Sequence, residues 1–146
     1  MTQASVTLLE GMRFTVETGS GHSLIVDSHE DVGGIDAGPR PLELMTASIA
    51  GCTAMDVISI LRKMQQRVTA LEVRVRTKDA EEHPRRFLEV HIEYLVTGHD
   101  LSAERVRRAI ELSETKYCPA LATVRPGTTI HTNYKILPAL PGAALK

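Results

Sequence analysis

Alternating apolar and polar positions near the N-terminus predict a meander of three short strands. Residues 5–10, 12–18 and 22–27 each have the length and the pattern of a strand. Gly11 and the GSG sequence at 19–21 supply the turns between them. We therefore expect a small antiparallel unit over about residues 5–27.

A long apolar segment comes after a loop of Gly, Pro and Asp residues at 29–41. From about 41 to 66 nearly every face carries apolar or small residues until Arg62, which predicts a helix buried on all sides. Pro41 suits the first helical turn, where its missing N–H costs nothing. A helix of about 25 residues is about 37 Å long. One chain of 146 residues rarely covers such a helix alone, so this length predicts a homodimer.

The second half of the chain returns to strand patterns, covering about residues 70–136. Alternation at 70–78 and 87–98, around a polar turn, predicts a β-hairpin. Two helices, at 102–117 and 118–124, and a last strand at 127–136 follow. The order of these elements predicts one α+β domain over residues 1–146, with a largely antiparallel sheet around the long helix.

Composition excludes several classes of protein. Hydrophobic residues make up 42% of the chain and charged residues 24%, which is the balance of a globular protein. The formal net charge of −1 offers no basic surplus for nucleic acid or an anionic membrane. We find neither a signal-peptide pattern nor a window of the ~20 apolar residues that cross a bilayer. We expect a cytoplasmic protein with no nucleic-acid or membrane partner.

Two cysteines, Cys52 and Cys118, carry the candidate chemistry. A lone thiol in an apolar helix is more often a small core residue than a nucleophile. Cys118, however, precedes a proline at the start of a helix, where unpaired N–H groups favour a thiolate. Cys52 lies in mid-helix and needs a cation beside it to ionise. The local sequence therefore ranks Cys118 above Cys52, unless an Arg reaches Cys52.

The six histidines do not suggest a metal site. None has HxxH spacing, and the chain has no CxxC pair. His91 and His131 occupy strand positions that we expect to face solvent. We expect neither a bound metal nor a cofactor.

The cysteines and their surroundings resemble the OsmC/Ohr family of osmotically inducible and organic hydroperoxide resistance proteins. The resemblance rests on GPRPLELMTASIAGCTAMDVISILRK at 38–63 and RAIELSETKYCPA at 108–120. It extends over the chain, through GSGHSLIVD near the start and IEYLVTGHDL at 92–101. It looks closest to the YhfA-like branch.

This resemblance implies a fold and a chemistry. The fold is an intertwined homodimer with a sheet wrapped around long central helices. The chemistry is thiol-dependent reduction of organic hydroperoxides, with Cys52 as the peroxidatic thiolate and Cys118 as the resolving thiol. A thiol or dithiol reductant then restores the pair. Glu43, some nine residues before Cys52, matches a glutamate that orients an Arg from the partner chain.

The identity of that Arg stays open between two positions. Arg13 lies on the N-terminal strands, where the family has its Arg, and Arg40 lies in the GPRP sequence. Each could instead be a surface Arg. His22 is a further candidate, with a solvated turn histidine as the alternative. Asp56, one turn after Cys52, would oppose a thiolate if ionised, unless it caps, pairs with an Arg or points elsewhere.

Two other functions compete with the peroxidase. A protein of the same fold could hold an apolar or electrophilic small molecule without turning it over. Nucleic-acid binding by the α+β half is the third reading, and the net charge of −1 argues against it.

Overall fold

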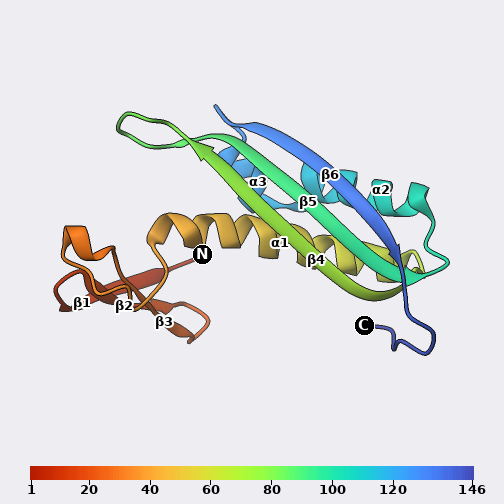
Figure 1. Cartoon of the computed structure of the whole chain (residues 1–146), viewed down its shortest axis with the longest axis horizontal. Coiled ribbons are helices and arrows are strands. Elements are labelled where there is room, and N and C mark those ends of the chain that lie inside the picture. The colour runs from red at the N-terminus through yellow and green to blue at the C-terminus, as the bar shows by residue number, and fades with distance from the viewer. The chain divides into compact units, whose positions relative to one another are not determined.

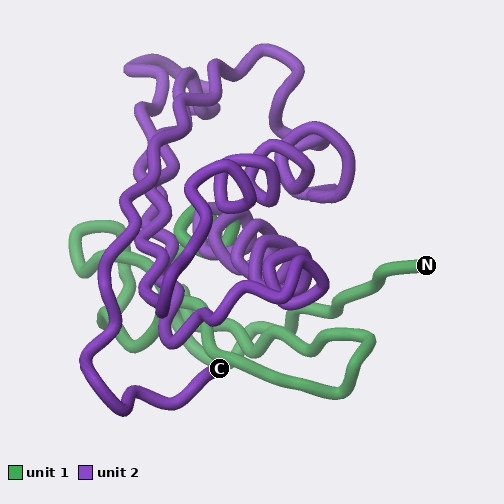
Figure 2. The backbone as a smooth tube through the Cα atoms, turned by 90° about the vertical axis from the view of Figure 1, so that its right-hand side faces the viewer, with its two compact units in different colours: residues 1–45 green, residues 46–146 purple.

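The computed structural model describes all 146 residues, which fall into two units at residues 1–45 and 46–146 (Figure 2). The boundary lies inside α1 (Pro41–Lys63), so this helix begins in one unit and continues through the other. Each unit has its own three-stranded sheet. The expected single domain thus has two units, which are described in turn.

The first unit is the predicted meander. β1 (Ala4–Glu10), β2 (Arg13–Thr18) and β3 (Ser23–Val26) pair antiparallel in chain order. Gly11 adopts the left-handed conformation that the first turn requires, with φ of 58°. A short 3₁₀ helix, η1 (Glu30–Val32), follows in the expected loop.

A buried carboxylate organises that loop. Asp27 accepts backbone N–H bonds from Ser28, Ile35 and Ala37 at 2.7 to 3.1 Å. These bonds hold the pKa of Asp27 below its ordinary value, because they favour the ionised form. The chain that leads into α1 is therefore a defined structure.

The second unit is a sheet with helices on one face (Figure 1). Its strands are β4 (Arg67–Asp79), β5 (Phe87–His99) and β6 (Thr129–Pro138). β4 and β5 form the predicted antiparallel hairpin, whereas β6 pairs parallel to β5. A parallel return needs a crossover connection. This crossover contains α2 (Ala103–Leu112), η2 (Ser113–Tyr117) and α3 (Pro119–Val124).

The core lies between the helices and the inner face of this sheet. On β5, the positions that alternate inward are buried: Val90, Ile92, Tyr94 and Val96. They pack in one cluster with side chains from all three helices, including Val57 of α1, Val106 of α2 and Leu121 of α3. Each cysteine contacts this cluster, so the core is also what positions the thiols.

One predicted helix ends earlier than expected, and another changes its type within the predicted bounds. α1 ends at Lys63, because Gln65 adopts a left-handed backbone conformation with φ of 57° and turns the chain into β4. The predicted helix at 102–117 is α-helical only to Leu112 and continues as the π-helical turn η2. Such turns insert a residue into a helix and are often found at functional sites.

α1 is less covered in the single chain than its sequence suggests. Its buried residues recur at every fourth position and form one stripe: Ile49, Thr53, Val57 and Leu61. Met55, on another face, is 73% exposed. α1 is also long and apolar enough to cross a membrane, with a window of mean hydropathy 1.7, contrary to our expectation that no such window exists. Length and composition do not by themselves identify a membrane-spanning helix, because the core helices of globular proteins meet the same criterion.

Candidate active site

The two cysteines meet inside the second unit. Cys52 lies on α1 and Cys118 immediately precedes α3. The sulfurs of both and a carboxylate oxygen of Asp56 all lie within 4.8 Å of one another. Both thiols are free. Residues far apart in the sequence thus form one cluster of two thiols and a carboxylate, a donor set that also suits a thiophilic metal ion.

The crossover connection explains why the thiols meet. The helices between β5 and β6 pack on the face of the sheet that α1 covers. The π-helical turn then ends in a bond of 2.8 Å from the Cys118 N–H to the Ser113 carbonyl oxygen. This bond fixes the backbone at which Cys118 leaves the turn and α3 begins.

At Cys118, burial raises the pKa of the thiol more than the N–H groups at the start of α3 lower it. Its Sγ accepts the Leu121 N–H at 3.4 Å, as a helix-capping group does. The residue is only 3% exposed, and this burial raises the pKa of the thiol to about 11, against the opposing effect of the Leu121 N–H. The neighbouring Cys52 raises it further. The helix start therefore does not make Cys118 a ready thiolate, contrary to the expectation from the sequence. Cys52 is half-buried and more accessible.

Asp56 pairs with a hydroxyl and not with an Arg. The Ser113 Oγ–H donates to Asp56 Oδ2 at 3.1 Å, and Ser113 is fully buried. The bond joins the two elements that carry the cysteines, α1 and the π-helical turn. Ser113 was not a site candidate from the sequence, because a serine within the predicted helix at 102–117 carries no functional signal of its own.

A second polar group lies beside Cys118. The hydroxyls of Tyr94 and Thr132 both donate to Glu114 Oε1, and the Arg125 guanidinium donates to the Glu114 carbonyl oxygen at 2.9 Å. Tyr94 is fully buried, which raises its pKa above the ordinary value. None of these residues was a site candidate from the sequence.

A surface hollow of about 580 Å³ borders this region, and Cys118 contributes to its wall. Lys116, Arg125 and the acidic Glu114 also line it, so the hollow carries side chains of both charges.

Two sequence candidates lie in the first unit, on or beside its sheet. Arg13 forms an ion pair with Glu10 at 3.2 Å and lines a small hollow with Asp27. His22 lies in the turn before β3, where Nδ1 is 3.1 Å from Ser20 Oγ. Arg13 is thus already oriented by a carboxylate of its own unit.

Arg40 and Glu43 meet at the start of α1. Glu43 accepts the Arg40 backbone N–H at 2.8 Å, as an acidic residue in a first helical turn does. The Arg40 guanidinium forms an ion pair with Asp36 at 2.6 Å and contacts His29 Nδ1 at 2.9 Å. Its Nε is buried without a partner. Arg40 therefore keeps one donor unused.

The chain matches known proteins over most of its length. The model of the OsmC-like protein family matches residues 33–133. Protein YhfA of Escherichia coli K12 is 36% identical over 137 residues, which cover 94% of this chain and 99% of YhfA.

Solved structures share the fold. A hypothetical protein from Aquifex aeolicus VF5 superposes with a TM-score of 0.84 at 26% identity, over 96% of this chain and 98% of that one. The organic hydroperoxide resistance protein OhrB of Bacillus subtilis superposes with a TM-score of 0.61 at 15% identity, over 92% and 98%. The second likeness is one of fold alone.

Proposed function

This chain belongs to the OsmC-like protein family, and on that premise we propose that it is a cysteine-based peroxidase that reduces organic hydroperoxides in oxidative stress defence. The observation that carries the proposal is the cluster of Cys52 and Cys118, whose sulfurs lie within 4.8 Å. The name of the B. subtilis relative supports the class of substrate.

The reaction proceeds in three steps. The Cys52 thiolate attacks the terminal peroxide oxygen, the O–O bond breaks, and the alkoxide takes a proton to leave as the alcohol. The resulting Cys52 sulfenic acid reacts with the Cys118 thiol, which forms the S–S bond and releases water. A dithiol reductant then exchanges with this disulfide, becomes oxidised itself and restores both thiols.

Exposure supports these roles for the two thiols. Cys52 is half-buried and can be reached by a peroxide, whereas Cys118 is 3% exposed. Cys118 attacks as the thiolate, so its proton must leave with the sulfenic hydroxyl as water when the disulfide forms. An S–S bond of about 2.05 Å requires the sulfurs to approach further than in the reduced protein.

Activation of Cys52 requires a cation, and Arg13 and Arg40 are the candidates. An Arg beside the sulfur favours the thiolate and stabilises the charge that develops on the leaving oxygen. Glu43 then orients the guanidinium, as a carboxylate does in a charge-assisted pair. Arg40 has an unpartnered Nε, but this atom is buried and would have to move to reach the thiolate. Arg13 remains the choice that the family resemblance favours.

The proposed working unit is a cytoplasmic homodimer. Large apolar side chains that the single chain leaves exposed support it, among them Leu8 at 56% and Met55 at 73%. A second copy is the partner that would bury them and could bring its own Arg to the thiols.

Cumene hydroperoxide tests the proposal. We expect one equivalent per subunit to convert the reduced protein to a Cys52–Cys118 disulfide, identified by peptide mass spectrometry. In Cys118→Ser, dimedone should trap sulfenic acid on Cys52. Arg13→Met and Arg40→Met, compared with the exposed control Arg85→Met, should identify the activating cation by a rate loss of about 10²-fold.

Three outcomes would contradict the proposal or its details. Sulfenic acid on Cys118 in the Cys52→Ser variant, together with none on Cys52 in the Cys118→Ser variant, would exchange the two roles. Disulfides only between chains would remove the resolving role of Cys118. If neither thiol reacted within minutes, the protein would be a non-catalytic binder, and ligand-dependent thermal stabilisation would be the property to measure.

A further inference from the structure

Two histidines that are far apart in the sequence lie side by side on the outer face of the second sheet. The parallel register of β5 and β6 sets His91 directly opposite His131. Their rings are stacked, with centroids 4.5 Å apart and planes inclined by 13°. Each side chain is 49% exposed, so both rings are open to solutes.

A carboxylate completes the cluster. Glu89 precedes His91 by two residues and therefore shares its face of β5. Its Oε2 lies 2.9 Å from His91 Nε2 and 3.5 Å from His131 Nε2. One ligating atom from each residue lies within 4.8 Å of the other two.

We propose that Glu89, His91 and His131 form a binding site for a divalent transition-metal ion such as Zn²⁺. Two imidazole nitrogens and a carboxylate oxygen are ligands that Zn²⁺ prefers, at about 2.0–2.2 Å each. A tetrahedral ion at such distances holds its ligand atoms roughly 3.4 Å apart. Since the three atoms already lie within 4.8 Å, rotation of the exposed side chains brings them to the ion.

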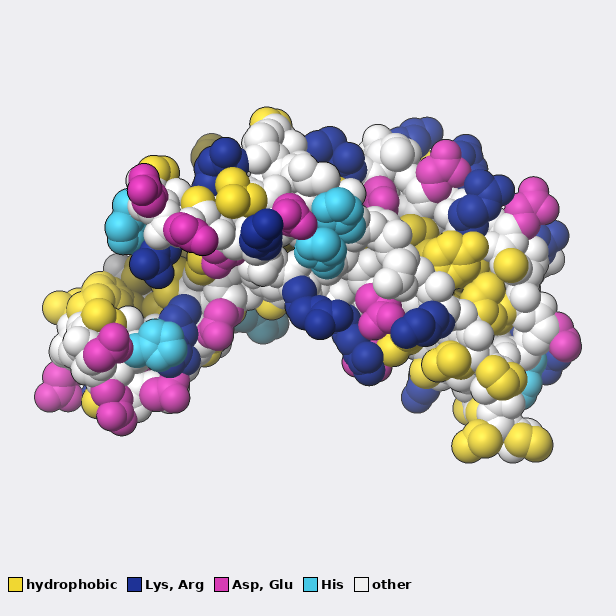
Figure 3. Space-filling model, turned by 45° about the horizontal axis from the view of Figure 1, so that its top comes forward, with side chains coloured by type: hydrophobic (Ala, Val, Ile, Leu, Met, Phe, Trp, Pro, Cys, Tyr) yellow, Lys and Arg dark blue, Asp and Glu magenta, His cyan; other side chains and the backbone are white.

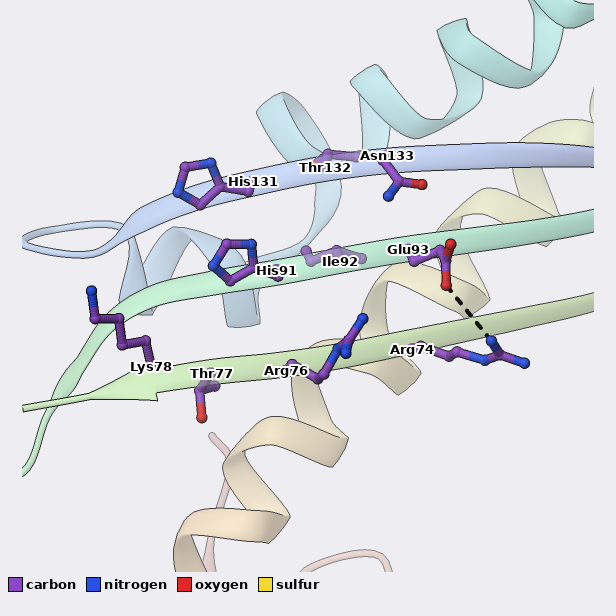
Figure 4. Close-up of a pocket in the computed structure, with 10 residues that line it drawn as sticks. All are labelled: Arg74, Arg76, Thr77, Lys78, His91, Ile92, Glu93, His131, Thr132 and Asn133. Atoms are coloured by element: carbon purple, nitrogen blue, oxygen red, sulfur yellow. Dashed lines mark ion pairs between the residues drawn. The ribbon is translucent and has the colours of Figure 1, made fainter.

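The surroundings leave a coordination position open. A hollow of about 410 Å³ lies over the rings, and Figure 4 shows His91 and His131 on neighbouring strands of its wall. Figure 3 shows histidine side chains beside Lys and Arg side chains on an exposed face. Water or a small anion could enter this hollow and complete the shell of the ion.

Neighbouring cationic side chains disfavour binding of the metal ion. Removing one of them is therefore a control in which binding should strengthen. Lys78 Nζ lies 3.1 Å from Glu89 Oε1, which leaves Oε2 to the ion. Arg76 lines the same hollow. Because positive charge repels a divalent cation, Lys78→Gln should tighten binding.

The site is separate from the thiols. His91 alternates with Val90 and Ile92, which are buried on the inner face, so its ring projects from the outer face. The cluster of Cys52, Asp56 and Cys118 packs with the inner core and could take up metal by itself. The test therefore needs a protein without thiols.

Zn²⁺ titration of the Cys52→Ser/Cys118→Ser protein, followed by calorimetry, tests the site. We expect one equivalent per chain. His91→Ala and His131→Ala should each weaken binding at least about tenfold, and Glu89→Gln by a similar factor. The matched control His83→Ala, an exposed histidine outside the cluster, should bind like the parent.

A second measurement distinguishes the loss of zinc binding from the loss of the folded structure. Zn²⁺ should raise the thermal midpoint of the thiol-free protein and leave that of His131→Ala unchanged, while both proteins show the same circular dichroism. No binding to the thiol-free protein would overturn the proposal. Unchanged affinity in His131→Ala, or an equal loss in His83→Ala, would overturn it as well.

Discussion

At the scale of single residues, Cys118 is the position where two local effects compete. The first N–H groups of α3 favour a thiolate, and one of them does bond to the sulfur. Removal of the side chain from water favours the neutral thiol and dominates, so the pKa rises from 9.0 to about 11. α3 has six residues, and such a short helix offers little field to oppose desolvation.

This balance predicts a pH dependence of stability. A thiol whose pKa is higher in the folded state contributes stability that is present below pH 9 and is lost as the pH rises through 11. We expect the free energy of unfolding of the reduced protein to fall across this window by roughly 2 kcal/mol.

Urea unfolding at several pH values, with a non-thiol reductant present, measures this slope. Cys118→Ser is the control, because it lacks the thiol and keeps the other alkaline groups, including Tyr94. Equal slopes in the two proteins would show that Cys118 does not carry the effect.

At the scale of elements, the crossover from β5 to β6 creates the site. A parallel strand pair requires such a connection, and its helices must cover the inner face of the sheet. The π-helical turn η2 leads to Cys118 at the start of α3, and the bond from Ser113 to Asp56 joins this turn to α1. The buried Ser113 hydroxyl therefore adds a direct bond to the core packing that holds the two sulfurs near each other.

Ser113→Ala should loosen this connection. We expect the free energy of unfolding to fall by about 1–3 kcal/mol, because a buried bond to a carboxylate is lost. We also expect the Cys52–Cys118 disulfide to form more slowly after peroxide is added.

Thr115→Ala is the matched control in the same turn. Its hydroxyl bonds only to the Glu111 carbonyl oxygen, and it is exposed. Its effect on stability should stay within about 0.5 kcal/mol. Equal losses of unfolding free energy in the two variants would mean that the bond between Ser113 and Asp56 stabilises the protein no more than the exposed bond of Thr115.

At the scale of the whole molecule, the single chain leaves much of the apolar helix α1 exposed or only partly buried. The helix buries one stripe, and 22% of its apolar window is covered within the chain. Large exposed apolar surfaces on a globular protein mark an interface. A second copy of the chain is the partner proposed above.

Met55→Asp should shift the protein from dimer to monomer. An unpaired carboxylate in an apolar interface is unfavourable, whereas in the monomer it would face water. Light scattering after gel filtration should give the 16.0 kDa of one chain for the variant and twice that mass for the parent. Leu140→Asp, at an exposed position in the C-terminal segment, is the control and should remain dimeric. A parent protein of 16.0 kDa would contradict the proposed dimer.

Short-range patterns predicted most of the elements. Alternation identified β4 and β5, and the Pro41 start with its apolar run identified α1, because these signals lie within a few residues of one another. The family resemblance paired Cys52 with Cys118, and their sulfurs do lie close together. The predicted end of α1 was wrong, because Gln65 turns the backbone without a Gly or Pro at that position, and the change from α-helix to π-helical turn after Leu112 was not predicted.

The sequence by itself determined the elements, the family and the two thiols, because periodicity and motifs are properties of neighbouring residues. Only the tertiary structure decided the parallel pairing of β6, the burial of Cys118 and the bond from Ser113 to Asp56. It also decided the meeting of His91 with His131, which no spacing along the chain indicates. Each of these depends on residues brought together across the core or across a strand pair, so the physical cause lies in packing and register.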